Sequence, residues 1–244
     1  MPNQQPRAAF PTTRITLIEA ARGELTPEAR DALAVLCSAY WYPIYAYIRR
    51  LGYRPEDAED LTQGFFARVL EKHYLRAFER ERGRFRSFLL GALKHFVANE
   101  RDWARAQKRG GRSPTLPLDA VIHTAEKRYS LEPGHDLTPE RVFARQWALA
   151  VLHRVQERLQ AEAERDGKAA QFARLKSRIT TDEQDLGYRA IALELNTTEG
   201  AVKVTVHRLR RRFRELLREE ISHTVETPED VGVELRELMA ALRG

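Results

Sequence analysis

The stretch "YRAIALELNTTEGAVKVTVHRLRRRF" (188–213) carries two helical hydrophobic patterns separated by a few polar residues. In the first, Ile191, Ala192 and Leu195 share one helical face, and the small Ala192 lets a second helix cross close by. Thr198 is the predicted N-cap of the second helix. The inner face of that helix consists of Val202, Val206, Leu209, Phe213 and Leu216, spaced by four, three, four and three residues. This pattern predicts a helix-turn-helix motif.

The turn between the two helices contains Asn196, where such motifs usually have glycine. Asparagine tolerates the left-handed backbone conformation better than most residues, so we expect the turn to form there. The residues left on the outer face of the second helix are mostly polar or charged: Glu199, Gly200, Lys203, Thr205, His207, Arg208, Arg210 and Arg211.

The N-terminal part of the second helix of such a motif enters the major groove of DNA. Glu199, Lys203 and Thr205 are therefore the candidates for contacts with base edges. His207, Arg208 and Arg211 lie further along the helix. The arginines there should contact phosphates, which adds affinity more than sequence choice.

Positive charge is concentrated in this helix. Between Lys203 and Arg218 there are seven Lys or Arg residues and one acid, and this excess of six equals the net charge of the whole 244-residue chain. A hydrophobic content of 43% is normal for a folded protein. The excess charge therefore lies on a folded surface and indicates an anionic partner, either nucleic acid or an acidic membrane surface.

Several classes of site are disfavoured by the composition. The single cysteine, Cys37, lies in an apolar run and excludes a disulfide within the chain. The seven histidines show no metal-ligand spacing with it, and no catalytic constellation is evident. No apolar run approaches the roughly 18 residues of a membrane span. We expect a cytoplasmic protein without metal or cofactor that is not an enzyme and does not insert into a membrane.

Helical periodicity recurs along nearly the whole chain, which predicts an all-α fold. Thr26 with Pro27 and Arg54 with Pro55 are helix starts, Gly52 is a helix end, and Pro43 predicts two helices or one bent helix between them. We expect two small helical domains joined by a flexible linker, the second containing the helix-turn-helix. The predicted boundaries are a disordered N-terminus (1–13), a first domain (14–109), a linker (110–138), a second domain (139–221) and a C-terminal helical extension (222–244).

The first domain combines an acidic helix with a basic one. Residues 54–74 carry five acids against three Lys or Arg residues, which suits a basic protein surface or a solvated face. Residues 83–112 interleave basic residues with polar and aromatic ones, as single-stranded nucleic acid sites do. Phe85, Phe88 and Phe96 are predicted core residues in this helix, and Gly64 in the acidic helix would permit a close contact.

Three segments in order, "AEDLTQGFFARVL", "FRSFLLGALKHFVANERDWARAQKRGG" and "YRAIALELNTTEGAVKVTVHRLRRRFREL", resemble the bacterial RNA polymerase sigma-70 family, and within it the small two-domain extracytoplasmic-function (ECF) group. The resemblance covers residues 28–220 and rests on the order and spacing of motifs in both domains. It implies a sigma factor that binds core polymerase, through its β′ and β subunits, and directs it to promoter DNA.

The resemblance also implies roles for individual residues. The implied contacts with the polymerase clamp are Asp60, Leu61, Gln63 and Phe66. The resemblance implies that the loop from Phe78 to Arg84 and His95 contact the −10 element. The basic and aromatic residues Lys94, Arg101 and Trp103 of the following helix are added to these as −10 candidates. The implied −35 element contacts are Glu199, Lys203, Thr205, His207, Arg208 and Arg211. The linker would run toward the active-site channel.

Two positions depart from the family pattern: Gly64 replaces an acid, and His95 replaces an asparagine. The alternative function is a stand-alone helix-turn-helix regulator, which would bind duplex DNA tightly without polymerase. A nucleic-acid enzyme is a weaker alternative because no cluster of carboxylates or nucleophile is seen. The extension 222–244 has an apolar stripe and either packs on the second domain or binds a partner, and an anti-sigma or other regulatory protein is a further candidate partner.

Overall fold

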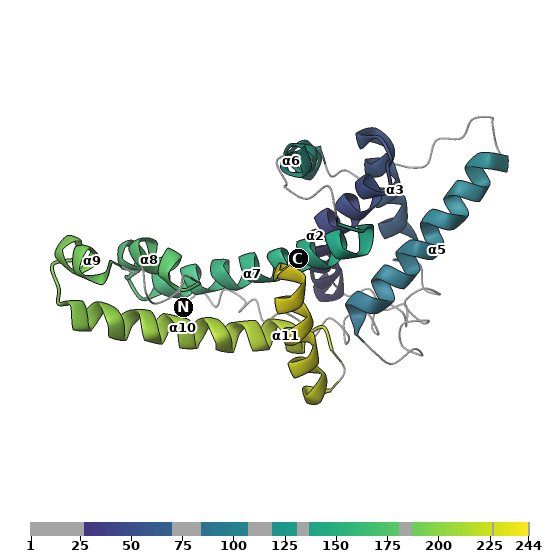
Figure 1. Ribbon diagram of the computed structural model, residues 1–244. Helices are drawn as coiled ribbons and strands as arrows, with labels where there is room; N and C mark the ends of the chain where they lie inside the picture. Colours follow the sequence, from purple (N-terminus) through teal and green to yellow (C-terminus); the bar gives the residue numbers. More distant parts are fainter. Residues whose placement is uncertain are drawn as a thin grey trace. The chain divides into compact units, whose positions relative to one another are not determined.

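The computed structural model describes residues 27–69, 84–106, 119–130, 137–180, 187–225 and 227–243 (Figure 1). All regular structure in these ranges is helical, which confirms the all-α class. The helices are α2 (Pro27–Arg50), α3 (Pro55–Val69), α5 (Phe85–Ala106), α6 (Asp119–Ser130), α7 (Pro139–Arg165), α8 (Ala169–Leu175), the 3-10 helix η1 (Lys176–Arg178), α9 (Tyr188–Glu194), α10 (Glu199–Ser222) and α11 (Pro228–Arg243). The predicted disordered N-terminus and most of the predicted linker lie outside the described residues.

The chain divides into two compact units. Unit 1 consists of Met1–Ala150 together with Ile221–Gly244, and unit 2 consists of Val151–Glu220. The boundaries fall inside the long helices α7 and α10, whereas the sequence pattern places the break at residues 110–138 and separates the last 23 residues from both domains. Unit 1 is therefore built from two separate parts of the sequence.

The ends of α2 and the start of α3 follow the predicted signals. Helix α2 begins at Pro27 and α3 begins at Pro55, and Gly52 after α2 has the positive φ of 92° that favours glycine. Pro43 does not divide α2, because the helix continues from Pro27 to Arg50. Proline removes one backbone donor there, and the aromatic and aliphatic side chains on both sides of it are buried, which stabilises the continuous helix.

The core of unit 1 is largely aromatic. Its buried side chains come from four helices and include Trp41, Ile44, Ile48, Phe65, Phe66, Phe85, Leu89, Leu93, Phe96, Phe143 and Trp147. Phe65 and Phe96 meet edge to face, with ring centroids 5.6 Å apart, and so join α3 to α5. The predictions that Phe85 and Phe96 lie in the core are confirmed, whereas Phe88 is only partly buried.

Part of the predicted linker is helical. Residues 119–130 form α6, although their sequence has no sustained helical hydrophobic pattern. Contacts with α2 hold the end of this helix: Glu126 accepts hydrogen bonds from Arg49 Nε at 2.9 Å and from the Tyr45 hydroxyl at 2.6 Å. Arg128 lies over the ring of Tyr42, 3.8 Å from its centroid. The prediction of a flexible linker over 110–138 does not hold for residues 119–130, which form a helix in contact with α2.

Unit 2 contains α8, η1, α9, most of α10 and the second half of α7. Leu175 of α8 packs with Ile191, Ala192, Val202 and Val206 in one apolar cluster. In Figure 1, α8 and α9 lie along the same side of α10. The inner faces predicted for α9 and α10 are confirmed at these positions, and α8 adds a third helix to the cluster that the sequence pattern did not predict.

Ion pairs join α7 and α10 within unit 2. Arg212 pairs with Glu162 at 2.7 Å, and Arg158 pairs with Glu219 at 2.8 Å. The partners run in opposite order along the two helices, so the paired segments are antiparallel. The hydrogen bond from Arg212 lowers the pKa of the Glu162 carboxyl below its ordinary value.

Helix α11 belongs to unit 1. The Phe85 N–H donates to the Thr224 carbonyl at 3.1 Å, which joins the start of α5 to the segment that leads into α11. Leu238 has no exposed surface, whereas Met239 is 47% exposed. Of the two alternatives for residues 222–244, packing on the second domain is not what the structure shows, because α11 lies in unit 1 and pairs its carboxylates with Arg86 of α5 and with Arg84 just before it.

Candidate nucleic-acid interface

The turn between α9 and α10 takes a backbone conformation that few residues favour. Asn196 has a φ of 49°, and it is the one non-glycine residue with positive φ in the described part of the chain. The Thr197 N–H donates to the Ala192 carbonyl at 2.9 Å, which closes the end of α9. The left-handed conformation predicted for Asn196 is confirmed, and it redirects the chain into α10.

Helix α10 begins with a side-chain cap. Thr198 Oγ1 accepts a hydrogen bond from the Ala201 N–H at 3.2 Å, and the Thr198 carbonyl accepts one from Val202 at 3.1 Å. The predicted N-cap is confirmed. Glu199 lies in the first turn, where its negative charge interacts favourably with the positive end of the helix dipole. The first turn of α10 is exposed to solvent from Glu199 to Ala201.

The three predicted base-contacting side chains already have partners within α10. Lys203 Nζ lies 2.7 Å from Glu199 Oε1, and both side chains are about half exposed. This bond lowers the pKa of the Glu199 carboxyl and raises that of the Lys203 ammonium. The Thr205 hydroxyl donates to the Ala201 carbonyl at 2.8 Å. All three could reach DNA only by exchanging or sharing these hydrogen bonds.

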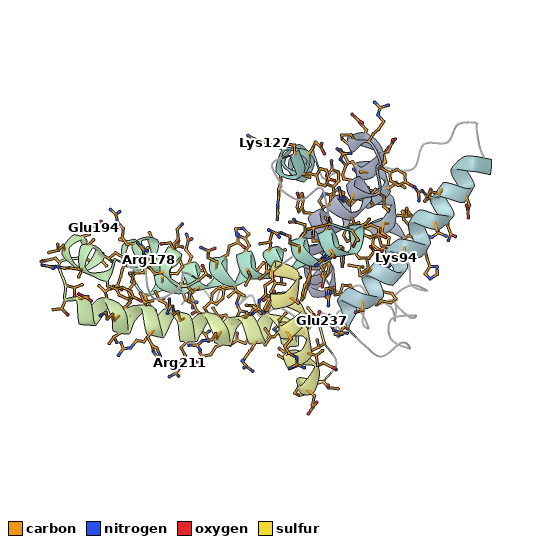
Figure 2. The ribbon with its side chains drawn as sticks, viewed as in Figure 1. Lys94, Lys127, Arg178, Glu194, Arg211 and Glu237 are labelled. Carbon is orange, nitrogen blue, oxygen red and sulfur yellow. The ribbon has the colours of Figure 1, made fainter. Side chains whose placement is uncertain are left out.

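The three predicted contacts further along α10 have exposed side chains. His207, Arg208 and Arg211 are all exposed, and Arg211 forms an ion pair with Glu215 at 3.0 Å. Figure 2 shows Arg211 on the side of α10 that faces away from α8 and α9. These residues give the outer face of α10 the cationic surface that phosphate contacts need.

Two arginines of the same run face the protein. Arg210 donates from Nε and Nη2 to the Arg178 carbonyl at 3.2 and 3.1 Å, and Arg212 pairs with Glu162. The expectation that Arg210 faces outward is wrong, because its long side chain reaches back to satisfy the end of η1. The basic residues of α10 therefore form two sets. His207, Arg208 and Arg211 lie on the outer face and are the candidates for phosphate contacts, whereas Arg210 and Arg212 bind other parts of unit 2.

Sequence reasoning missed Val204, which is 51% exposed. At about 100° per residue, Val204 lies about 200° around the helix from buried Val202, so it is near the centre of the outer face. The signal was present in the sequence, because valines at 202, 204 and 206 cannot all face inward on one helix. Val204 is an apolar residue in the middle of a charged surface.

The four predicted −10 contacts whose side chains the structure describes are not gathered at one place. Lys94 and His95 are exposed neighbours on α5, and Lys94 pairs with Glu140 at 2.8 Å, which lowers the pKa of that carboxyl. Arg101 is exposed and lies over the Tyr53 ring, 5.7 Å from its centroid. Trp103 belongs to α5, but its side chain lies outside the described part of the structure, as does all of Phe78.

Arg84, the remaining predicted −10 contact, faces α11 instead of solvent. Its Nη1 atom lies 3.1 Å from Glu234 Oε2, and it also pairs with Glu237. The hydrogen bond to Glu237 raises the pKa of the Arg84 guanidinium. Arg86 binds the same two carboxylates and lies over the ring of Trp147, 4.6 Å from its centroid. In this conformation Arg84 has a structural role.

The four predicted polymerase contacts on α3 divide into two pairs. Asp60 is exposed and Leu61 is partly exposed. Gln63 and Phe66 are buried, and the Phe66 ring stacks on Trp41 of α2 with centroids 5.7 Å apart. Only Asp60 and Leu61 are therefore at the surface, next to the exposed acids Glu56 and Asp57.

Among the described residues, no three His, Cys, Asp or Glu side chains gather as a metal-binding group. None of the described helices combines the length and the apolar character that crossing a membrane requires. Comparison of the chain with known protein families, with characterised proteins and with solved structures gives no match.

Proposed function

We propose that the protein is an RNA polymerase sigma factor of the ECF type. It would bind core polymerase, recognise the −35 and −10 promoter elements and assist DNA opening, in the cytoplasm and without catalytic activity of its own. The observation that carries the proposal is the geometry of α9, the Asn196 turn and α10, which exposes His207, Arg208 and Arg211 on one helix face. The order of motifs along the chain supports the rest.

The α9–α10 pair would be the helix-turn-helix that binds the −35 element. Its first helix packs on α10 through Ile191 and Ala192, which leaves the start of α10 exposed for entry into the major groove. The charged side chains further along α10 would contact phosphates. The intrahelical pair of Glu199 and Lys203 would open on DNA, so that Lys203 donates to a base or phosphate.

The exposed acids of α3 would bind a basic surface on the polymerase β′ subunit. The polymerase β subunit would contact the domain that contains α9 and α10. Asp60 and Leu61 would supply contacts, and Glu56 and Asp57 would add negative charge in the first turn. Gln63 and Phe66 would act indirectly, because both are buried and the stacking of Phe66 on Trp41 of α2 fixes the orientation of the exposed face.

Lys94, His95 and Arg101 of α5 would contact the unpaired −10 strand. All three are exposed, and they lie within three turns of one helix. Cationic side chains follow a single-stranded backbone while aromatic groups stack on bases. Arg84 is left out of this proposed surface because Glu234 and Glu237 bind its guanidinium.

The test is transcription with purified core polymerase on a library of promoter templates. A sigma factor yields promoter-dependent transcripts only when the chain and the core enzyme are both present. A stand-alone regulator instead binds duplex DNA tightly without polymerase and yields no such transcripts. Absence of a promoter-dependent product across the whole library would refute the proposal.

Two variants separate the proposed surfaces. Asp60→Lys should weaken binding to core polymerase and leave the fold intact, since Asp60 is exposed. Lys203→Ala should weaken use of the −35 element and leave core binding unchanged. Asp166→Lys and Lys168→Ala are matched controls, because both residues are 63% exposed and lie in the turn between α7 and α8.

A further inference from the structure

The outer face of α10 has an apolar centre. Val204 is 51% exposed, one of three large hydrophobic side chains that are clearly exposed among the described residues. It lies on the side of α10 opposite to Val202 and Val206, which have almost no exposed surface. A single exposed valine on an ordinary surface needs no explanation, but this one is at the centre of the face proposed to enter the major groove.

The side chains around Val204 leave it accessible to DNA. One turn before it, Gly200 and Ala201 are exposed and have no long side chains. A Cβ atom added at Gly200 would meet nothing nearer than the Thr198 hydroxyl at 4.0 Å. One turn after Val204, the exposed His207 and Arg208 supply polar and cationic groups. DNA could therefore approach Val204 closely, while a phosphate beside the following turn would meet the cationic side chain of Arg208.

The polar neighbours of Val204 are occupied within the helix. Lys203 is paired with Glu199 at 2.7 Å, and the Thr205 hydroxyl is bonded to the Ala201 carbonyl at 2.8 Å. Of the residues at 203–205, only Val204 offers its side chain without first breaking a hydrogen bond. Of these three residues, Val204 can therefore contact a base edge most readily.

We propose that Val204 selects thymine in the duplex −35 element by packing on the C5-methyl group. The major-groove edge of thymine is the one base edge that carries a methyl group, and apolar side chains recognise it. Cytosine presents a hydrogen at the equivalent carbon and an amino donor beside it, so Val204 would lose the contact there. This inference rests on the proposed function and names a base that α10 prefers.

The test uses the full chain with core polymerase and the duplex bound most tightly from a randomised −35 library. Each thymidine of that duplex is replaced, one at a time, by deoxyuridine, which lacks only the methyl group. We expect one replacement to weaken binding about fourfold, the effect of removing one buried methyl-sized group. The other replacements should have little effect.

The variant Val204→Ala completes the comparison. It should bind the thymidine duplex about fourfold more weakly than the parent, and it should no longer distinguish thymidine from deoxyuridine at the sensitive position. Val204→Thr, which keeps one methyl group, should retain part of the discrimination. Leu193→Ala is the matched control, because Leu193 is a 78% exposed apolar side chain on α9.

The outcomes separate this inference from the proposed function. If the parent binds a selected duplex but every deoxyuridine replacement is silent, or if Val204→Ala keeps the same discrimination, the thymine contact is wrong and the proposed function stands. If no duplex is bound with or without polymerase, both are wrong. Circular dichroism of each variant confirms that α10 is intact.

Discussion

Arg86 Nε of α5 donates a hydrogen bond to Glu234 Oε1 of α11 at 2.9 Å, across 148 residues of sequence. Glu234 has no exposed surface and Arg86 is 9% exposed, so both charges are removed from water. Such a pair contributes little net stability compared with apolar residues, but removing one partner leaves an uncompensated buried charge. The pair therefore fixes where α11 docks.

Glu234→Gln should destabilise the protein by up to about 3–5 kcal/mol, because the buried Arg86 would lose its buried carboxylate and keep only the partly exposed one of Glu237. The change is measured by urea unfolding followed by circular dichroism. Glu237→Gln is the matched control, because Glu237 is 41% exposed and its loss should cost about 1 kcal/mol or less. Equal effects of the two substitutions would contradict the assigned role, and the double variant Arg86→Met with Glu234→Leu should recover much of the stability.

Gly64→Ala should stabilise the protein by about 1 kcal/mol, the difference in helix propensity between the two residues. A Cβ atom at Gly64 would lie 3.5 Å from Phe96 Cζ, which is ordinary van der Waals contact. The midpoint of urea unfolding should rise. Gly52→Ala is the control with the opposite expected sign, because Gly52 has a φ of 92° that alanine adopts only at a cost of about 1 kcal/mol or more. A lower midpoint for Gly64→Ala would show that Phe96 cannot accommodate the methyl group.

The ion pair between Arg212 and Glu162 predicts a pH dependence. Its hydrogen bond holds the pKa of the folded Glu162 carboxyl below the ordinary value of 4.5. A carboxyl with a lowered folded-state pKa stabilises the fold above pH 4.5, and that stabilisation is lost as the pH falls through the folded-state pKa. Glu162→Gln should therefore cost about 0.5–1 kcal/mol near neutral pH, and this difference should shrink as the pH falls through the folded-state pKa of Glu162.

The control for this pH series is Glu164→Gln. The Glu164 carboxyl is exposed and accepts a hydrogen bond from Gln160 at 2.9 Å within the same helix. Unfolding free energies of the parent and both variants are compared across the acidic range. A constant difference between the parent and Glu162→Gln at all pH values would exclude the ion pair as its cause.

Asn196→Gly should be neutral or stabilise the protein by up to about 1 kcal/mol, because glycine adopts the φ of 49° without strain. Asn196→Val should destabilise it by about 1–2 kcal/mol, since a β-branched residue disfavours the left-handed conformation. Thermal unfolding measures both changes. If the turn positions α10 for binding, the affinities of the two variants for duplex DNA should rank in the same order as their stabilities. Equal DNA affinities of the two variants would show that the turn affects folding but not DNA recognition.

Local sequence patterns correctly predicted the features that depend on residues close to one another in the sequence. The spacing of Val202 and Val206 gave the inner face of α10, and Thr198 gave its cap. Proline and glycine marked the ends of α2 and α3. These features depend on propensity and periodicity, which a sequence shows directly.

The features that sequence patterns missed depend on distant partners or on long side chains. Phe66 is buried because Trp41 of another helix stacks on it, and Glu234 is buried where it pairs with Arg84 and Arg86, which are 150 and 148 residues away. Arg210 follows the outward spacing of α10 but bends back to the Arg178 carbonyl. Helical spacing alone therefore does not show that a residue is available for binding. The contacts of its side chain with neighbouring helices must also be known.

The Arg86–Glu234 pair also has a consequence for synthesis on the ribosome. Helix α5 is translated before unit 2, and α11 is translated after it. At about 5–20 residues per second, the 148 residues from Arg86 to Glu234 delay the arrival of Glu234 by about 7–30 seconds. During that time Arg86 has no carboxylate from α11, so the nascent unit 1 cannot complete its native core. A transcript truncated before α11 would therefore yield a chain that is open to proteolysis, and only chains that extend through α11 would accumulate.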